Sequence, residues 1–577
     1  MIGTAAVRDA FPAPRTWPAR ILTVLVVGVV GGLGAVGLQS GLRACTHLFQ
    51  NVLAGYPAPE VAAYGGHAAA LGGFHSVTRM WALPFVVALG MTIAVLVSRF
   101  ADRPVAGTDG VIDAVNTGET DRLTWRTATA KLVATAATLG SGGSGGTEGP
   151  VAQVGASFAA ALARRLRVDP GQVAVAAVAG LAAGVGALFR APLGGALLGA
   201  ELLRRRGLDL PLVLPCLFAS FAGYAVFGAV LGYGPMFGHV SLGGFAETRD
   251  LIPLLCVGVL CGLLARAYCV CFHGATRLLA RLRAGGPTSS VSTAAGAGLL
   301  VGAAGLFVPE VLGTGYGTVQ SELSAAVLLS APLWLLCVLP VAKILATSAT
   351  LGAGGVGGVF GPAMVIGGSA GALCWRASAD LGLHPGSAPL YVVTGVAACL
   401  GPAVRAPLAT AFLAAGLTGA QVPPLGLALA VLVALPLLGG EGLFPHQRRG
   451  ARDEPRPPAL RYGEKPLYQT YAKGDGRARA AVPGRTGGEG VPGQPTGGGA
   501  VAAAEVDDEV EAESSGIPDL TELPLEVLVD REDGALSRAI RLARSRRAGA
   551  GIVYAGFSNA APAPARAQVE PDDEPDS

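Results

Sequence analysis

The chain repeats one pattern twice, and this repeat restricts its fold more than any other feature. Residues 130–150, AKLVATAATLGSGGSGGTEGP, are identical to residues 342–362, AKILATSATLGAGGVGGVFGP, at 14 of 21 positions. A second pair of matching stretches follows in the same order, and each contains Arg-Ala-Pro-Leu. Internal repeats, often inverted in topology, build membrane proteins that hold a site between their halves. We therefore predict two homologous halves, about 80–230 and 290–440.

Long stretches without charge indicate a membrane protein. Residues 21–42, 344–375 and 406–440 contain no Asp, Glu, Lys or Arg. A helix that crosses a bilayer needs about 20 apolar residues, and the charged fraction of 14% lies below the roughly 25% of a soluble domain. We predict an all-α polytopic membrane protein over residues 21–445, with discontinuous helices and with lipid around it. A net charge of +3 gives no reason to expect a nucleic-acid partner.

The two ends of the chain differ from this apolar part. Residues 1–20 hold three arginines before an apolar run that is longer than that of a signal peptide, so we expect a cytosolic segment and a retained helix. Residues 446–577 are rich in Gly, Pro, Ala and charge, which favours a largely disordered tail with a short ordered piece at 521–554. A regulatory module is the alternative for that piece. Basic clusters predict that both termini are cytosolic, and the Arg-rich, Lys-poor composition favours a bacterial inner membrane.

Glycine-rich turns that end in Gly-Pro predict a helix start in each half. Pro suits the first turn of a helix because its missing N–H has no partner there, and Gly lets the backbone approach a ligand closely. The first N–H groups of a helix lack an internal acceptor and carry positive potential, so two such starts together form an anion site. The alternative is that the glycines only allow close helix packing. The residues of this shared frame are Gly146, Gly149, Pro150, Gly358, Gly361 and Pro362.

The two copies differ at one position that matters for chemistry. Glu148 in the first copy corresponds to Phe360 in the second. A carboxylate at a helix start competes with an anion for the same N–H groups, and acids inside a membrane are functional candidates by default. Glu148 is therefore the predicted gate of the site. The alternative is a structural cap that is bonded to its own helix.

These motifs resemble those of the CLC family of chloride channels and proton-coupled chloride transporters. GTEGP at 146–150 is similar to the family signature G(K/R)EGP, and GVFGP at 358–362 is similar to GxFxP. AGTDGVIDAV at 106–115 falls where the family has GSGIP, and only Gly107 and Thr108 match it. The resemblance covers roughly residues 20–445 and implies the CLC fold.

The resemblance also implies roles for single residues. Glu148 resembles the gating glutamate, and Val359 and Phe360 resemble donors of backbone N–H to a central chloride. Phe444 falls about where the family has a tyrosine whose hydroxyl touches the anion, so that hydroxyl is missing here. Chloride would be the transported ligand, no cofactor is implied, and the protein would be a homodimer with one pathway in each subunit. The expected anion-binding residues are Gly107, Thr108, Gly146, Gly149, Gly358, Val359, Phe360, Gly361 and Phe444.

Four further residues surround this expected site. Thr147 stands where the family has a basic residue, which removes a positive charge near the outer entrance. Lys131 could supply positive potential to the pathway, or could instead pair with Glu148 or with a backbone carbonyl. Glu201 resembles a structural glutamate. Leu202 stands where family exchangers often carry the acid that takes the proton, and an apolar residue there is typical of the channel branch.

Three hypotheses follow from the sequence. The first is gated, passive conduction of chloride or a similar small anion, and the second is proton–chloride exchange through the same pathway. The third is a membrane scaffold or enzyme that does not transport. We find no nucleophile–base pair, metal cluster or phosphate-binding loop, and the nine cysteines form no CxxC pair. The chain is therefore not expected to be an enzyme.

Overall fold

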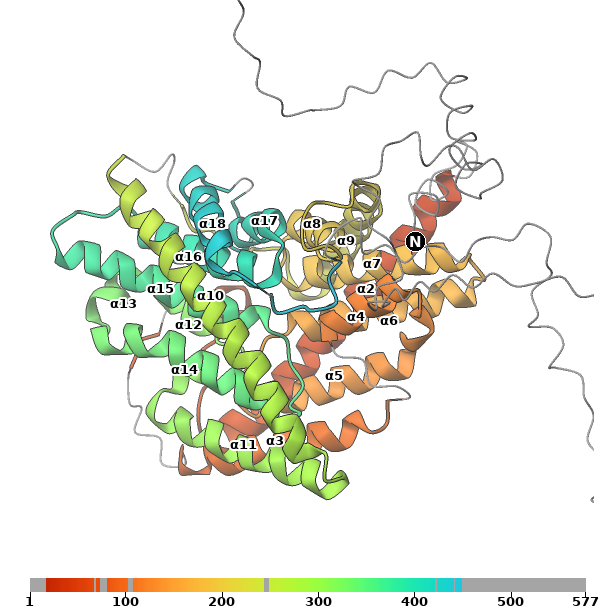
Figure 1. The fold of residues 1–577 in the computed structure, drawn as a ribbon, viewed down its shortest axis with the longest axis horizontal. Coiled ribbons are helices and arrows are strands. Elements are labelled where there is room, and N and C mark those ends of the chain that lie inside the picture. The colour runs from red at the N-terminus through yellow and green to blue at the C-terminus, as the bar shows by residue number, and fades with distance from the viewer. Residues whose placement is uncertain are drawn as a thin grey trace, which may run out of the picture. The chain divides into compact units, whose positions relative to one another are not determined.

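A computed structural model describes residues 17–448, apart from 67–68, 73–79, 102–106, 243–247, 421–422 and 441. The predicted N-terminal segment and tail lie outside these residues, except for 17–20 and 446–448. The described part is built from helices (Figure 1).

The helices before residue 240 include both long and short ones. The long α2 continues into a π-helix, His47–Leu53. The α-helices in this part are α2 (Trp17–Thr46), α3 (Leu83–Ser98), α4 (Gly107–Thr117), α5 (Trp125–Gly140), α6 (Glu148–Arg165), α7 (Pro170–Leu188), α8 (Pro192–Glu201) and α9 (Leu210–Leu231).

The helices after residue 240 follow a similar plan. They are α10 (Thr248–Arg283), α11 (Pro287–Phe307), α12 (Tyr316–Glu322), α13 (Ala325–Ser330), α14 (Leu333–Gly352), α15 (Phe360–Asp380), α16 (Ala388–Val404), α17 (Pro407–Leu417) and α18 (Leu425–Leu437). Helices α5 to α9 therefore have counterparts in α14 to α18, in the same order. The predicted all-α architecture with two repeats is confirmed.

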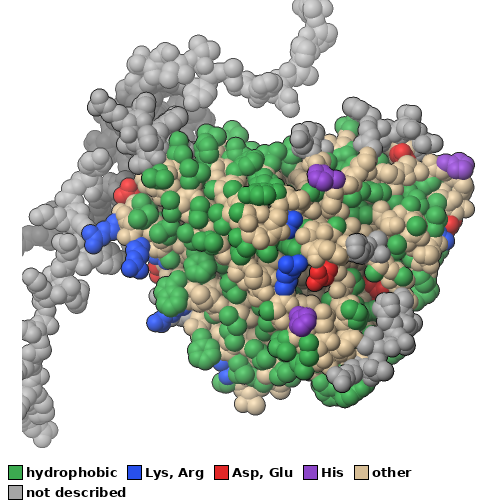
Figure 2. Space-filling model, turned by 180° about the vertical axis from the view of Figure 1, so that it is seen from behind, with side chains coloured by type: hydrophobic (Ala, Val, Ile, Leu, Met, Phe, Trp, Pro, Cys, Tyr) green, Lys and Arg blue, Asp and Glu red, His purple; other side chains and the backbone are tan. Residues whose placement is uncertain are grey.

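The surface of the helical part is suited to lipid. Seven helices of the described residues are long and apolar enough to cross a bilayer. Hydrophobic side chains cover much of the face in Figure 2. Over the described residues, large hydrophobic side chains such as Phe85, Phe218 and Leu300 are exposed. Such contiguous apolar surface is unfavourable in water and favourable against acyl chains.

Short helices in matching places make the predicted discontinuities. Helix α8 has 10 residues and α17 has 11, so each is about 15 Å long and cannot cross a bilayer of about 30 Å. Each begins with Pro after an Arg-Ala turn. Arg190 and Arg405 in these turns both adopt positive φ, 55° and 54°, although non-Gly residues rarely do so. The two halves therefore share an unusual backbone conformation as well as a sequence.

Counterpart helices also pack on one another across the halves. Helix α3 packs on α11, and α8 packs on α17. A Cβ on Gly194 would lie 2.6 Å from the Cα atom of Leu413, so only glycine allows this approach of α8 to α17. In Figure 1, α15 and α14 lie on the left and α6 and α5 on the right. This arrangement is that of two halves related by an approximate two-fold axis.

Reciprocal hydrogen bonds mark the position of this axis. The N–H of Gly146 donates to the carbonyl of Gly358 at 2.7 Å, and the N–H of Gly358 donates back at 2.6 Å. Farther out, the N–H of Ser144 donates to Thr350 Oγ1 at 3.1 Å. The corresponding Val356 N–H donates to Thr138 Oγ1 at 3.0 Å. Each of these contacts has an equivalent in the other half, and the two glycine-rich turns are thereby bound to each other.

One pair of counterparts breaks this symmetry. Thr347 Oγ1 lies 2.9 Å from the hydroxyl of Ser144. Its counterpart Thr135 would need a hydroxyl at residue 356, where the chain has Val. Thr135 Oγ1 is accordingly buried without a hydrogen-bond partner among the described residues.

This difference provides a matched pair of variants. We expect Thr350→Val to lower the free energy of unfolding by about 1–3 kcal/mol, because the buried N–H of Ser144 loses its acceptor. Thr135→Val should be neutral or stabilising, since it removes a hydroxyl that bonds to nothing described. Thermal unfolding of both variants in detergent measures the difference. Equal losses of stability would show that the cross-bonds between the turns do not matter.

Candidate functional site

Two helix starts face each other directly beyond the glycine bridge. Helix α6 begins at Glu148 and α15 begins at Phe360, each two residues after the bridged pair Gly146 and Gly358. The prolines Pro150 and Pro362 occupy the third position of each helix. The N–H groups of both first turns therefore point toward a common region, where the two helix dipoles add positive potential.

The carboxylate of Glu148 occupies this region. The side chain is 1% exposed, and its Oε1 accepts a hydrogen bond from the N–H of Gly361 in the opposite half. Its Oε2 has no hydrogen-bond partner in the described part of the chain. Glu148 thus bonds to the other half, a contact that the alternative of a structural cap bonded to its own helix does not account for.

The neighbouring glycines leave room for the carboxylate. A Cβ on Gly358 would lie 3.0 Å from Glu148 Oε2, and a Cβ on Gly361 would lie 3.0 Å from Oε1. A Cβ on Gly149 would lie 2.9 Å from the Cα atom of Gly358. Any larger residue at these positions would displace either the acid or the bridge, so the glycines serve the site as well as the packing.

Helix α4 brings a hydroxyl to the same place. Gly107 begins α4 with a positive φ of 56°, and Thr108 follows it. Thr108 is 3% exposed, and its Oγ1 has no described hydrogen-bond partner. A Cβ on Gly149 would lie 3.5 Å from this oxygen, which places the hydroxyl beside the start of α6. The hydroxyl is therefore a free donor next to the helix starts.

Aromatic residues close the site on the side of α15. The rings of Phe360 and Phe444 pack with their centroids 5.9 Å apart. Phe444 comes from the segment after α18, so the structure places it beside the helix start. Val359 precedes Phe360, and its carbonyl accepts a hydrogen bond from the Tyr268 hydroxyl at 3.3 Å.

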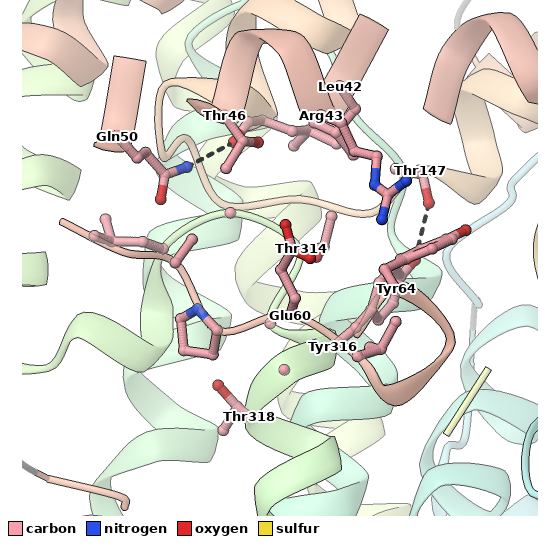
Figure 3. A pocket seen from close by; sticks show the side chains of 18 of the residues that line it. Leu42, Arg43, Thr46, Gln50, Glu60, Tyr64, Thr147, Thr314, Tyr316 and Thr318 are labelled. Carbon is pink, nitrogen blue, oxygen red and sulfur yellow. Dashed lines mark hydrogen bonds between the residues drawn. The ribbon is translucent and has the colours of Figure 1, made fainter. Parts of the chain in front are cut away.

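A cavity of about 110 Å³ adjoins the site at Thr147 and Tyr316. Thr147 lies in its wall and bonds to the hydroxyl of Tyr316 at 3.1 Å (Figure 3). Arg43 lines the same cavity, with its guanidinium 4.2 Å from the ring centroid of Tyr64. Glu60 lies in the wall as well. Although residue 147 carries no charge, the cavity therefore contains a cation from α2.

The lysine that lies near the site is Lys343, the counterpart of Lys131 in the second half. Lys343 on α14 is fully buried and donates to the carbonyls of Val311 and Gly313, at 2.9 and 3.0 Å. Its charge lies close enough to Glu148 to interact with it electrostatically. Lys131 on α5 is only partly buried and makes no hydrogen bond or ion pair with any described residue. The alternative, a pairing of Lys131 with Glu148 or with a carbonyl, is not found among the described residues, and its supply of positive potential to the pathway stays a prediction.

Glu201 and Leu202 lie at the end of α8 and contact other partners. Glu201 accepts hydrogen bonds from the N–H groups of Leu408 and Ala409, at 3.3 and 2.8 Å. It thereby satisfies the first turn of α17, as expected of a structural glutamate. Leu202 is buried, and its carbonyl accepts a bond from Gln447 at 2.9 Å.

Sequence reasoning missed three residues of the site. Tyr316 and Tyr268 come from helices far from Glu148 in the sequence, and no motif around them points to an anion. Lys343 could have been recognised as a candidate from its alignment with Lys131. Among the described residues, no group of three or more His, Cys, Asp or Glu forms a metal site.

Curated relatives share much of this chain. Residues 89–437 match the voltage gated chloride channel family. An uncharacterised protein of Methanocaldococcus jannaschii is 32% identical over 314 residues, which cover 54% of this chain and 75% of that protein. The voltage-gated ClC-type chloride channel ClcB of Shigella flexneri is 30% identical over 259 residues, or 44% of this chain and 59% of that protein.

Solved structures have the same fold. A CLC-type fluoride/proton antiporter has a TM-score of 0.61 at 20% identity and covers 76% of this chain and 100% of that one. A slow cyanobacterial Cl⁻/H⁺ antiporter has a TM-score of 0.60 at 19% identity, with 75% and 97% covered. At such identities the structural match shows the fold alone, and the assignment to a family rests on the family match over residues 89–437. The resemblance seen in the motifs is confirmed, and the chain belongs to the voltage gated chloride channel family.

Proposed function

We propose that this chain carries chloride, or a similar small anion, through a pathway gated by Glu148. The supporting observation is the contact of the Glu148 carboxylate with the Gly361 N–H at the start of α15. A carboxylate oxygen is itself an anion held by a helix N-terminus. When the carboxylate is protonated or turns away, the same N–H groups and the same positive potential are free to hold chloride.

The remaining groups complete the proposed pathway. The backbone N–H groups of Val359 and Phe360 would bind the central anion, with the glycines around Glu148 giving it room. The Thr108 hydroxyl is a donor without a described partner, so it is free to bond the anion. Phe444 has no hydroxyl to add, and Thr108 would then carry more of the recognition at that end.

Passive conduction is the mechanism that we favour. An exchanger needs a second acid to pass protons to the far side, and Leu202 stands at the position expected for it. Exchange is the second candidate, because Glu148 is a buried acid within the pathway and could itself accept a proton. The two mechanisms use the same anion site and differ in whether chloride and proton movements are coupled.

We further propose a homodimer in a bacterial inner membrane, with both termini cytosolic. Both helix starts belong to one chain, so each subunit would contain a complete pathway. No cofactor is required by this mechanism, since electrostatic attraction and hydrogen bonding are enough to bind chloride.

The gate is tested by removing the acid. We expect Glu148→Ala and Glu148→Gln to give chloride flux that has lost its rise on the acid side, because no titrating carboxylate then competes for the helix starts. Flux from proteoliposomes over a range of pH measures this. Glu119→Gln is the control, since Glu119 is an exposed acid paired with Arg122. Variants of Glu148 with unchanged flux and pH response would remove it from the gate.

The choice between conduction and exchange is tested by coupling. We expect that a chloride gradient across proteoliposomes drives no steady uphill proton movement, because residue 202 cannot carry a proton. A chloride electrode and a pH-sensitive dye measure the two ions together. A fixed ratio of protons to chloride would establish exchange instead.

The buried lysine provides a further test. We expect Lys343→Met to lower chloride flux roughly tenfold, the low end of the effect of local charge on ion concentration in a low-dielectric cleft. Lys131→Met should cause a smaller loss, since Lys343 and not Lys131 is among the charged groups that act on Glu148. The comparison uses equal amounts of protein that elutes as a single folded species. A larger effect at Lys131 would contradict the assignment of Lys343.

A further inference from the structure

A short segment after α18 closes the end of the site at Phe444. This segment, residues 442–448, is called the strap here and contains Phe444, which packs on Phe360. The N–H of Leu443 donates to the carbonyl of Ala403 at 2.8 Å. Gln447 donates to the carbonyls of Leu202 and Val404, both at 2.9 Å. The predicted start of the tail, residue 446, thus lies within the strap, because residues 446–448 are bonded to the helical part.

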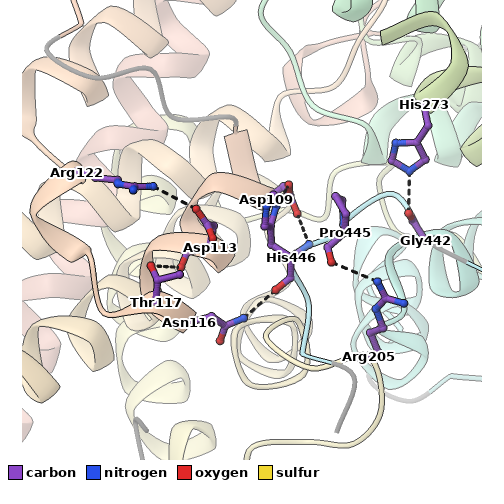
Figure 4. Close-up of polar contacts among 10 residues, drawn as sticks. All are labelled: Asp109, Asp113, Asn116, Thr117, Arg122, Arg205, His273, Gly442, Pro445 and His446. Carbon is purple, nitrogen blue, oxygen red and sulfur yellow. Dashed lines mark hydrogen bonds and ion pairs between the residues drawn. The ribbon is translucent and has the colours of Figure 1, made fainter. Parts of the chain in front are cut away.

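Other bonds to the strap come from three neighbouring elements (Figure 4). His273 of α10 contacts the carbonyl of Gly442 at 3.0 Å. Arg205, after α8, donates to the carbonyl of Pro445 at 3.3 Å, and Asn116 of α4 donates to that of His446 at 3.0 Å. Most of these bonds end on backbone carbonyls, which do not titrate.

One contact of the strap is an ion pair. His446 Nδ1 lies 2.6 Å from Asp109 Oδ2, and the His446 N–H donates to Asp109 Oδ1 at 3.2 Å. Asp109 follows Thr108 in the first turn of α4. This pair therefore joins the helix that presents the free hydroxyl to the strap that presents Phe444. The His446 side chain is 52% exposed, so it exchanges protons with solvent.

We propose that the Asp109–His446 pair positions Phe444 against Phe360 and makes anion passage depend on pH at this end of the pathway. The proposal rests on the anion pathway proposed above. With the pair intact, the strap is bound to α4 and Phe444 narrows the pathway beside the start of α15. With the pair broken, the strap keeps its carbonyl bonds but loses its tie to α4, and Phe444 moves more freely.

The charged groups around His446 determine when the pair forms. The hydrogen bond to Asp109 raises the pKa of His446, partial burial opposes this, and the charges of Asp109 and Asp113 raise it further. Burial raises the pKa of the Asp109 carboxyl, while its bonds to His446 lower it. Asp113 is itself paired with Arg122 at 3.3 Å. The remaining charged or titratable neighbours are Glu119, which pairs with Arg122, and Arg204, Arg205, Arg448 and His273.

The sign of the pH dependence follows from the raised pKa. His446 stays protonated to a higher pH than an ordinary histidine, so the pair is complete on the acid side. It is lost as pH rises through the pKa of His446. Phe444 is then released, and flux rises with pH, opposite to the acid-side opening expected from protonation of Glu148.

The experiment separates the two responses by removing the gate first. Chloride flux from proteoliposomes is measured between about pH 5 and pH 8, the range in which histidine titrates, in the Glu148→Ala background. We expect flux to rise with pH by up to about fivefold, the scale on which a partly exposed ion pair biases an equilibrium. His446→Gln and Asp109→Asn should give the high flux at every pH. His446→Lys should keep the low flux at every pH, because its charge does not titrate in this range.

A histidine elsewhere in the chain and a swapped pair serve as controls for His446. His384→Gln removes an exposed histidine between α15 and α16 and should leave the pH profile unchanged. The swap of Asp109→His with His446→Asp should restore a titrating pair and the rise in flux, which distinguishes the pair from a purely structural residue. A pH profile that survives His446→Gln would overturn the role of the pair while leaving the gate at Glu148 intact. Absence of chloride flux in every variant and in the unmodified chain would instead overturn the proposed function.

Discussion

The backbone pairing of Gly146 with Gly358 is the contact on which the rest of the site depends. It joins the two halves at their common axis and sets the starts of α6 and α15 two residues beyond it. Unpaired N–H groups inside a membrane are costly unless something satisfies them. Bringing two helix starts together concentrates these donors in one place, and an anionic group satisfies them. The Glu148 carboxylate does so in this structure through Gly361.

The two halves are nearly symmetric around the site, and they differ at its centre. The cross-bonds of Ser144 and Val356 to threonines of the opposite half are equivalent. At the centre, however, one half supplies an acid and the other supplies Phe360. Only one carboxylate therefore competes for two helix starts, and a site with two acids would repel anions. Lys343 is buried near Glu148, whereas its counterpart Lys131 is partly exposed, so the electrostatic environment is asymmetric too.

Much of the central site could be predicted from the sequence because its rules are local. Gly-Pro after a glycine-rich turn predicts a helix start wherever it occurs, and the repeat showed that the chain contains two. The position of Glu148 in one copy pointed to it as the gate. The sequence pointed to Lys131, whereas Lys343 is the fully buried lysine near Glu148. Sequence alone does not show which of two aligned side chains is buried. Tyr316 and Tyr268 were missed because their contacts arise from packing between distant helices.

The sequence by itself determined the class of the protein: uncharged apolar runs require a membrane, and the repeat with its motifs identifies the family and the acid. These conclusions rest on hydrophobicity and on short stretches of backbone, which act over a few residues. Only the tertiary structure decided which groups meet, such as Glu148 with Gly361, Phe444 with Phe360 and Asp109 with His446. Those partners are separated by scores to hundreds of residues, and their meeting depends on how the helices of both halves pack.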